Sequence, residues 1–262
     1  MALSIETCTA QHIGDREEQQ DRLALFKHPS RRGTLLAALA DGMGGYAGGA
    51  VAAEQVLHMA KHSFEAFAPV TESVQDMLAT GINDAHAAIR ITRYTSEQDP
   101  HSTACLFMLQ PGRADWAHCG DSRIYHFRNG ELIARSEDHS YVGEMVRSGF
   151  LTARQAETHP KRNVLLSCLG DVEAPKIAFG GTEPLQAGDC FILCSDGLWA
   201  YFPDAELGDA LRSMPPRQAA EALVERARQR GNGRGDNISL IIIKIIEVPD
   251  KPKWPQAPAD AR

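Results

Sequence analysis

The sequence has 262 residues, of which 43% are hydrophobic and 23% are charged. That is enough apolar material for a folded core, so disorder of the whole chain is excluded. The 27 lysines and arginines are outnumbered by 34 aspartates and glutamates, which gives a formal net charge of −7. This balance argues against a nucleic-acid-binding protein, because such proteins present a strongly basic face.

No apolar run approaches the roughly 18 residues that a membrane-spanning helix requires. The first eleven residues lack the basic and apolar regions of a secretory signal. Six cysteines occur without a Cys-x-x-Cys pair, a pattern that favours buried free thiols in a reducing compartment. We therefore expect a cytoplasmic protein with no membrane insertion.

The strands of the chain are short aliphatic or β-branched runs bounded by turn residues. They are expected at residues 4–9, 22–27, 34–40, 103–110, 113–118, 122–128, 131–135, 189–195 and 238–248. Asn129-Gly130 is a hairpin signal between two of these runs, and Pro111-Gly112 joins another pair. Such close connections predict antiparallel pairing.

Helices are expected in two stretches of the chain and in one shorter segment between them. The predicted ranges are residues 48–67, 71–92, 141–148 and one or two helices between 204 and 230. The second carries an amphipathic stripe, formed by Val74, Leu78, Ile82, Ala85 and Ile89. Because strands and helices each cluster along the chain, the pattern predicts an α+β fold with stacked sheets.

The distribution of strand, helix and proline signals also predicts the domain organisation. Residues 1–248 are predicted to form a single domain. Within it, residues 137–170 or thereabouts are long and poor in strand signal, which indicates a flap. Residues 249–262 are rich in proline and are predicted to be a disordered tail.

Aspartates recur at the ends of the apolar strands. Asp41, Asp121 and Asp196 each follow one, and Asp236 precedes the last. Carboxylates placed there lose solvation and repel one another unless a positive charge compensates. Together they would form a hard-oxygen site suited to Mg²⁺ or Mn²⁺. The alternative interpretation, that Asp-Gly and Asp-Asn are simply turn pairs, is favoured for any one of them alone; the set of four favours a metal.

Rival catalytic motifs are absent or incomplete. A glycine pattern after strand 34–40 resembles a dinucleotide fingerprint, but Asp41 would press a carboxylate toward the pyrophosphate and no acidic ribose ligand follows. The sequence has no Gly-Lys-Ser/Thr of a P-loop and no Gly-x-Ser-x-Gly elbow. No cysteine is followed six positions later by arginine, so a cysteine-nucleophile phosphatase is not indicated.

Eight blocks occur in a characteristic order between about residues 11 and 247. They include Ala40-Asp41-Gly42-Met43-Gly44, Ser102-Thr103-Ala104, Gly120-Asp121-Ser122-Arg123-Ile124-Tyr125, Asp138-His139-Ser140, Cys194-Ser195-Asp196-Gly197-Leu198-Trp199 and Gly235-Asp236-Asn237-Ile238-Ser239. This ordered set resembles the metal-dependent protein phosphatases, the type 2C serine/threonine phosphatases, in their bacterial form. The resemblance implies a four-layer β-sandwich of two antiparallel sheets flanked by helices, with a Mn²⁺ or Mg²⁺ centre at one end.

The resemblance also assigns metal ligands. The residue matching Asp41 bridges two ions, and the carbonyl matching Gly42 binds one of them. The residues matching Asp196 and Asp236 complete the shell of one ion. In bacterial members the residue matching Asp121 helps to hold a third, weaker ion.

Substrate binding is assigned to the first block of the family. There Arg16 would grip the substrate phosphate and Asp21 would support metal-bound water. The block departs from the usual pattern at Gln19 and Gln20, for which we expect weaker metal affinity. Met43 stands where animal members carry a histidine proposed as general acid, so the group that protonates the leaving oxygen is left open.

The implied activity is hydrolysis of phosphoserine and phosphothreonine in proteins by a metal-activated bridging water, with Arg16 and Asp41 as the catalytic pair. The expected partners are phosphorylated proteins made by a cognate bacterial serine/threonine kinase, and the expected state is a monomer. Two alternatives stay open: a scaffold without turnover, and a hydrolase of small phosphoesters. Retention of Asp41, Asp196 and Asp236 argues against the scaffold.

Overall fold

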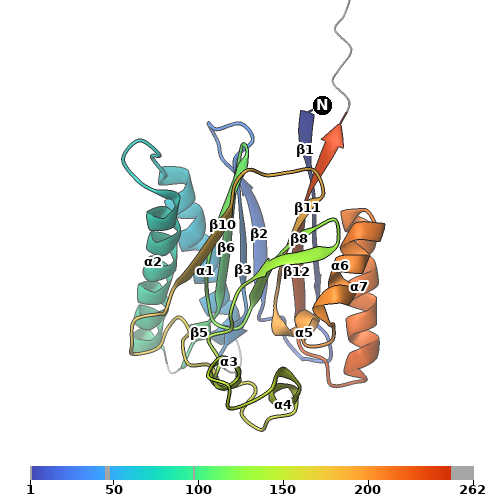
Figure 1. Ribbon diagram of the computed structural model, residues 1–262. Coiled ribbons are helices and arrows are strands. Elements are labelled where there is room, and N and C mark those ends of the chain that lie inside the picture. Colours follow the sequence, from blue (N-terminus) through green and yellow to red (C-terminus); the bar gives the residue numbers. More distant parts are fainter. Residues whose placement is uncertain (1, 45–47, 97, 249–262) are drawn as a thin grey trace, which may run out of the picture.

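The chain forms two stacked β-sheets covered on both outer faces by helices (Figure 1). The computed structural model describes residues 2–44, 48–96 and 98–248, so the expected tail at 249–262 lies outside the described residues. The layered α+β sandwich predicted from the sequence is confirmed. Among the described residues, no helix combines the length and the apolar character needed to cross a bilayer.

The first sheet is entirely antiparallel, in the order β1-β12-β11-β8-β9. Its strands are β1 (Ala2–His12), β12 (Ile238–Val248), β11 (Asp189–Cys194), β8 (Arg123–Arg128) and β9 (Glu131–Arg135). The first and last strands in the sequence pair along their whole length, from Ala2 opposite Val248 to His12 opposite Ile238. The sheet therefore brings the two ends of the domain together.

The second sheet is also antiparallel, in the order β10-β7-β6-β3-β2. Its strands are β10 (Ala178–Thr182), β7 (Arg113–Cys119), β6 (Ala104–Gln110), β3 (Leu35–Ala40) and β2 (Arg22–Lys27). A short pair, β4 (Gly42–Met43) and β5 (His101–Ser102), continues from the end of β3. Strand β10 was not predicted from the sequence.

The core between the sheets follows the two-residue alternation of the strands. On β12, Ile241 and Ile243 face the second sheet, whereas Leu240 and Ile242 face the helices. Aromatic rings fill the centre of the sandwich, where the ring centroids of Phe107 and Phe191 lie 4.7 Å apart. The residues of β11 and the first six residues of β6 are accordingly buried on both faces.

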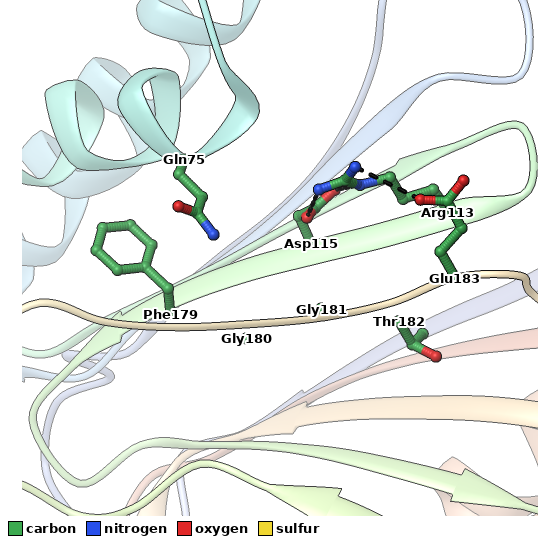
Figure 2. A pocket seen from close by; sticks show the side chains of 8 residues that line it. All are labelled: Gln75, Arg113, Asp115, Phe179, Gly180, Gly181, Thr182 and Glu183. Carbon is green, nitrogen blue, oxygen red and sulfur yellow. Dashed lines mark hydrogen bonds and ion pairs between the residues drawn. The ribbon is translucent and has the colours of Figure 1, made fainter.

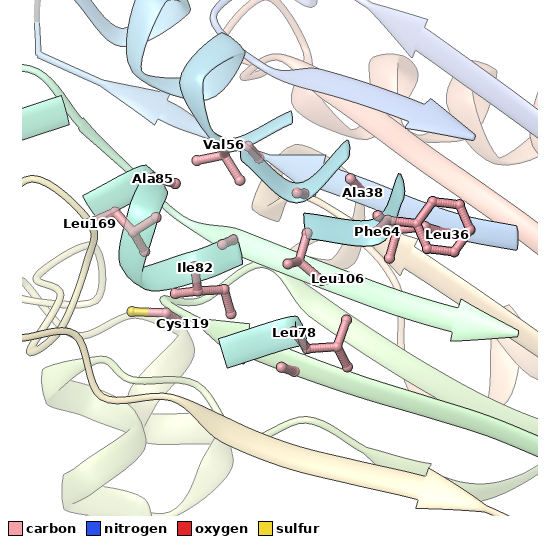
Figure 3. Packing of buried hydrophobic residues seen from close by; sticks show 14 of the residues in the cluster. Leu36, Ala38, Val56, Phe64, Leu78, Ile82, Ala85, Leu106, Cys119 and Leu169 are labelled. Atoms are coloured by element: carbon pink, nitrogen blue, oxygen red, sulfur yellow. The ribbon is translucent and has the colours of Figure 1, made fainter. Parts of the chain in front are cut away.

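Helices α1 (Gly48–Ala66) and α2 (Val74–Thr95) cover the outer face of the second sheet. Figure 3 shows their buried side chains meeting those of β3 and β6, including Phe64, Ile82 and Leu106. Helix α2 begins three residues later than predicted because the Ser73 side chain accepts a hydrogen bond from Asp76 N and so caps it. Helices α6 (Asp204–Ser213) and α7 (Pro216–Gly231) cover the first sheet.

Residues 137–170, the segment that we expect to be a flap and call the flap below, lie at one end of the sandwich (Figure 1). It contains α3 (Tyr141–Arg147) and α4 (Ala153–Glu157), of which only the first was predicted. Single β-bridges connect Ser140 with Leu165 and Ser102 with Leu169. The first of these bridges lies within the flap, and the second attaches the flap to β5, at the same end of the sandwich as the short helix α5 (Asp196–Trp199).

Candidate active site

Strand direction gathers the predicted aspartates at one end of the sandwich. Asp41 and Asp121 follow the ends of β3 and β7, and Asp196 follows β11 as the first residue of α5. Asp236 and Asp21 lie just before β12 and β2, which run in the opposite direction. All five carboxylates therefore arrive at the same end, beside the flap.

The electrostatics of this end show that the carboxylates influence one another. Burial raises the pKa of Asp21 to about 7, with a further contribution from the charges of Asp196 and Asp236. Burial raises the pKa of Asp121 to about 8 and that of Asp196 to about 6. The pKa of Asp41 is raised well above its usual range by burial and by the other four carboxylates. Such a group of acids binds protons or cations to relieve its own repulsion.

The donor chemistry of this acidic end fits a hard divalent cation. Within the part of the chain that the structure describes, no three His, Cys, Asp or Glu side chains form a group that encloses an ion unaided. Main-chain carbonyls and water would therefore complete any coordination shell. Mg²⁺ and Mn²⁺ suit this arrangement, because they take carboxylate, carbonyl and water oxygens together.

The main chain of Asp41 is held by two hydrogen bonds to Thr103, one to its side chain and one to its main chain. Asp41 N donates to Thr103 Oγ1 at 2.9 Å, and Thr103 N donates to Asp41 O at 2.9 Å. Thr103 Oγ1 also lies 2.8 Å from Ser122 Oγ, next to Asp121. One buried threonine thus connects the loops of two candidate ligands.

The neighbouring Gly42 is buried and allows two chain segments to meet. A Cβ at this position would lie 1.9 Å from Gly49 O, at the start of α1. No other residue fits without moving the backbone that carries Asp41. The glycine is therefore required by packing, whether or not its carbonyl binds a metal.

Asp21 is fixed by Ser195, which precedes Asp196. Ser195 Oγ donates to Asp21 Oδ2 at 2.8 Å and accepts from Ser239 N at 3.1 Å. Because Ser195 directly follows β11 and Ser239 lies on β12, two neighbouring strands of the first sheet fix the position of the Asp21 carboxylate. This hydroxyl was not singled out in the sequence; its position directly before Asp196 was the only local signal.

Arg16 lies on the loop between β1 and β2, with 61% of its side chain exposed. Its Nη2 donates to Asp236 Oδ2 at 2.5 Å, so its ion-pair partner is a candidate metal ligand. The loop is held by the buried Asn237, whose Oδ1 accepts from Gln20 N at 2.7 Å. Asn237 Nδ2 donates to Ile13 O at 2.8 Å and to the carbonyl of residue 18 at 2.9 Å.

The structure shows the surroundings of two residues that depart from the motif pattern, Gln19 and Met43. Gln19 Nε2 donates to His12 O at 3.1 Å, while Gln19 Oε1 accepts from Asp21 N at 2.9 Å. Gln19 therefore positions the main chain of Asp21. Met43 lies opposite His101 in the β4–β5 pair.

A cavity of about 300 Å³ lies at the far end of β7, beside β10 and the start of α2 (Figure 2). Its charged groups are already paired, because Arg113 donates to both oxygens of Asp115 at 2.6 and 2.7 Å. Strand β7 runs from this cavity to Asp121, a distance of about 20 Å at the usual rise per residue. The cavity is therefore separate from the acidic end.

Comparison with known proteins gives the family. The sequence profile named Protein phosphatase 2C matches residues 8–232, and the chain belongs to that family. The serine/threonine phosphatase stp of Listeria welshimeri is 30% identical over 235 residues, which cover 87% of this chain and 91% of the relative. The resemblance inferred from the ordered motifs is thereby confirmed.

Solved structures agree with this assignment. The serine/threonine phosphatase of S. agalactiae has a TM-score of 0.84 and 27% identity, covering 93% of this chain and all of that chain. The catalytic domain of the serine/threonine phosphatase PstP, solved with two manganese ions, has a TM-score of 0.77 and 25% identity over 94% of this chain and 100% of that chain. The fold and the enzyme class are those of metal-dependent serine/threonine phosphatases.

Proposed function

We propose that the acidic end of the sandwich hydrolyses phosphoserine and phosphothreonine in proteins. The observation that carries this proposal is the convergence of five aspartates and one arginine at the edge beside the flap. The carboxylates of Asp41, Asp121, Asp196 and Asp236, with the carbonyl of Gly42, would hold Mn²⁺ or Mg²⁺. When bound, such ions activate water and neutralise phosphoryl oxygens.

The chain's own groups supply binding and orientation. Arg16 lies at the solvent side of the acidic end, where its guanidinium can grip a phosphate in a two-pronged contact. Its ion pair with Asp236 keeps the positive charge over the acidic end before substrate arrives. Ser195 holds the side chain of Asp21 and Gln19 its main chain, at the end of the loop that carries Arg16.

The metal ion and the substrate are inferred from the relatives of this chain. Manganese is the expected ion because the PstP structure contains two manganese ions. A phosphoprotein made by a cognate serine/threonine kinase is the expected substrate, since the Listeria relative is named a serine/threonine phosphatase. A cytoplasmic monomer remains our expectation from the sequence.

The test is phosphate release from a phosphothreonine peptide, with Mn²⁺ and with chelator. Asp196→Asn should abolish metal-dependent turnover, whereas the exposed Asp209→Asn, which removes only an ion pair with Arg212, should not. Absence of turnover in folded, metal-loaded wild-type protein would contradict the proposal and favour the scaffold. Faster turnover of p-nitrophenyl phosphate than of the peptide would favour a hydrolase of small phosphoesters.

A further inference from the structure

Arg123, the first residue of β8, has its guanidinium contacted on every side. Its Nε and Nη2 each donate to one oxygen of Asp138 at 2.8 Å, and its Nη1 donates to the hydroxyl of Tyr125 at 3.1 Å. Its face lies 3.6 Å from the ring centroid of Trp199. The side chain is only 15% exposed. A lysine cannot reproduce this planar, two-pronged and stacked contact.

The partners of Arg123 belong to segments that hold the candidate ligand Asp121. Asp138 lies at the root of the flap, and the next residue, His139, donates its main-chain N–H to Gly120 O at 2.9 Å. The ring nitrogen Nδ1 of His139 accepts from Gly120 N at 3.3 Å. The flap root thus binds both main-chain groups of the residue before Asp121.

Trp199 reaches the same loop from the opposite side. Its indole Nε1 donates to Asp121 O at 2.9 Å. Trp199 is the last residue of α5, and Asp196, another candidate ligand, is the first. The main chain of Asp121 is therefore fixed between the flap root and α5, with Arg123 packed against both.

We infer that Arg123 is a positioning residue that couples the flap to metal binding at Asp121 and Asp196. The inference rests on the proposed function, because it takes these carboxylates as metal ligands. A displacement of the flap root moves Asp138 and with it the guanidinium and the stacked indole. Because the indole donates the hydrogen bond to Asp121 O, the affinity of this loop for a cation depends on the position of the flap.

The test is Mn²⁺ binding to metal-free protein by titration calorimetry, which does not depend on turnover. Arg123→Lys should weaken Mn²⁺ binding by roughly 10-fold or more, the usual effect of removing a group that orients a ligand. Arg113→Lys is the matched control, because it disrupts a two-pronged Arg–Asp contact at the other end of β7. It should leave the affinity within about 2-fold of wild type.

Hydrogen exchange separates coupling from a merely structural role. In wild type, Mn²⁺ should slow amide exchange in flap residues 138–147, and Arg123→Lys should abolish this protection while Mn²⁺ is saturating. Trp199→Phe keeps a ring for Arg123 but removes the N–H that binds Asp121 O, and it should weaken Mn²⁺ binding similarly. If Arg123→Lys fails to fold, the Mn²⁺ affinity of Trp199→Phe tests the inference instead.

The inference would be overturned by wild-type Mn²⁺ affinity in a folded Arg123→Lys or Trp199→Phe protein, or by unchanged flap protection in Arg123→Lys. An equal loss of affinity in Arg113→Lys would also overturn it. If the affinity and exchange results are as expected but wild type releases no phosphate from the peptide, the coupling stands and the proposed function fails.

Discussion

Replacing Asn237 by alanine tests whether the loop of Arg16 depends on one buried amide. The change removes three hydrogen bonds of 2.7 to 2.9 Å that join this amide to main-chain groups of the loop. At about 1 kcal/mol each the loss is about 3 kcal/mol. For a domain of this size that corresponds to a fall in Tm of roughly 6 to 12 °C. Because Arg16 moves with the loop, kcat/KM for a phosphopeptide should fall by about 100-fold.

The assay combines thermal unfolding, phosphate release and amide exchange of residues 13–20. The expected result is faster exchange of this loop in Asn237→Ala, with exchange in the strands of the second sheet unchanged. Asn83→Ala, an exposed amide on α2, is the control and should leave all three measurements near wild type. Wild-type exchange of the loop together with a Tm change below 2 °C would refute the reasoning.

Three further predictions concern the acids, a glycine and the core. The pKa values of Asp21 and Asp121 are raised from 3.8 to about 7 and about 8, so their contribution to folding is full below about pH 4 and is lost as the pH rises through these values. In EDTA, Tm should therefore fall between pH 5 and 8.5 and Mn²⁺ should reduce that fall; a Tm that rises with pH in EDTA would contradict this. Gly197→Ala places a Cβ 2.0 Å from a main-chain oxygen of the neighbouring loop and should abolish turnover. Gly112→Ala, where the Cβ meets open space, should lower the free energy of unfolding in urea by only about 1 kcal/mol. Equal turnover in the two variants would contradict this prediction. Phe107→Ala should cost about 3 to 5 kcal/mol in the same assay, and a loss below about 1 kcal/mol would mean that the rings between the sheets are not a packed core.

The strands that end in aspartate could be predicted because their signal is local. A buried aliphatic run followed by Asp-Gly, as at Asp41 and Asp196, fixes both the strand and the end at which the carboxylate emerges. The alternating strand directions then bring these ends together without any further information. Their roles as metal ligands remain predictions that the metal-binding experiments address.

Strand β10 could not be predicted because its glycines have a non-local cause. Gly180-Gly181 reads as a turn, yet Gly180 lies opposite Trp116, and a Cβ there would come within 2.4 Å of the indole. Glycine is needed so that the strand can pass over this ring. The residues around Gly180 do not indicate this contact, because Trp116 lies 64 positions earlier in the sequence.

The residues that orient the site were missed for the same reason. Asn237 binds a loop more than 200 positions away in the sequence, and Arg123 meets Asp138 only because the β8–β9 hairpin returns the chain to it. Both residues lie in the motif blocks, but nothing in those blocks indicates which groups they bind. Such contacts become visible only when the two sheets are assembled.

The end-to-end pairing of β1 and β12 has a practical consequence. Ala2 and Val248 are partners at the end of the sandwich opposite to Asp236, and an eleven-residue strand separates the two ends by about 33 Å. A biotin or an affinity handle attached beside Ala2 or Val248 would hold the molecule on a sensor surface with the acidic edge and the flap turned outward. Capture of phosphoproteins on such a surface would then sample the proposed catalytic face.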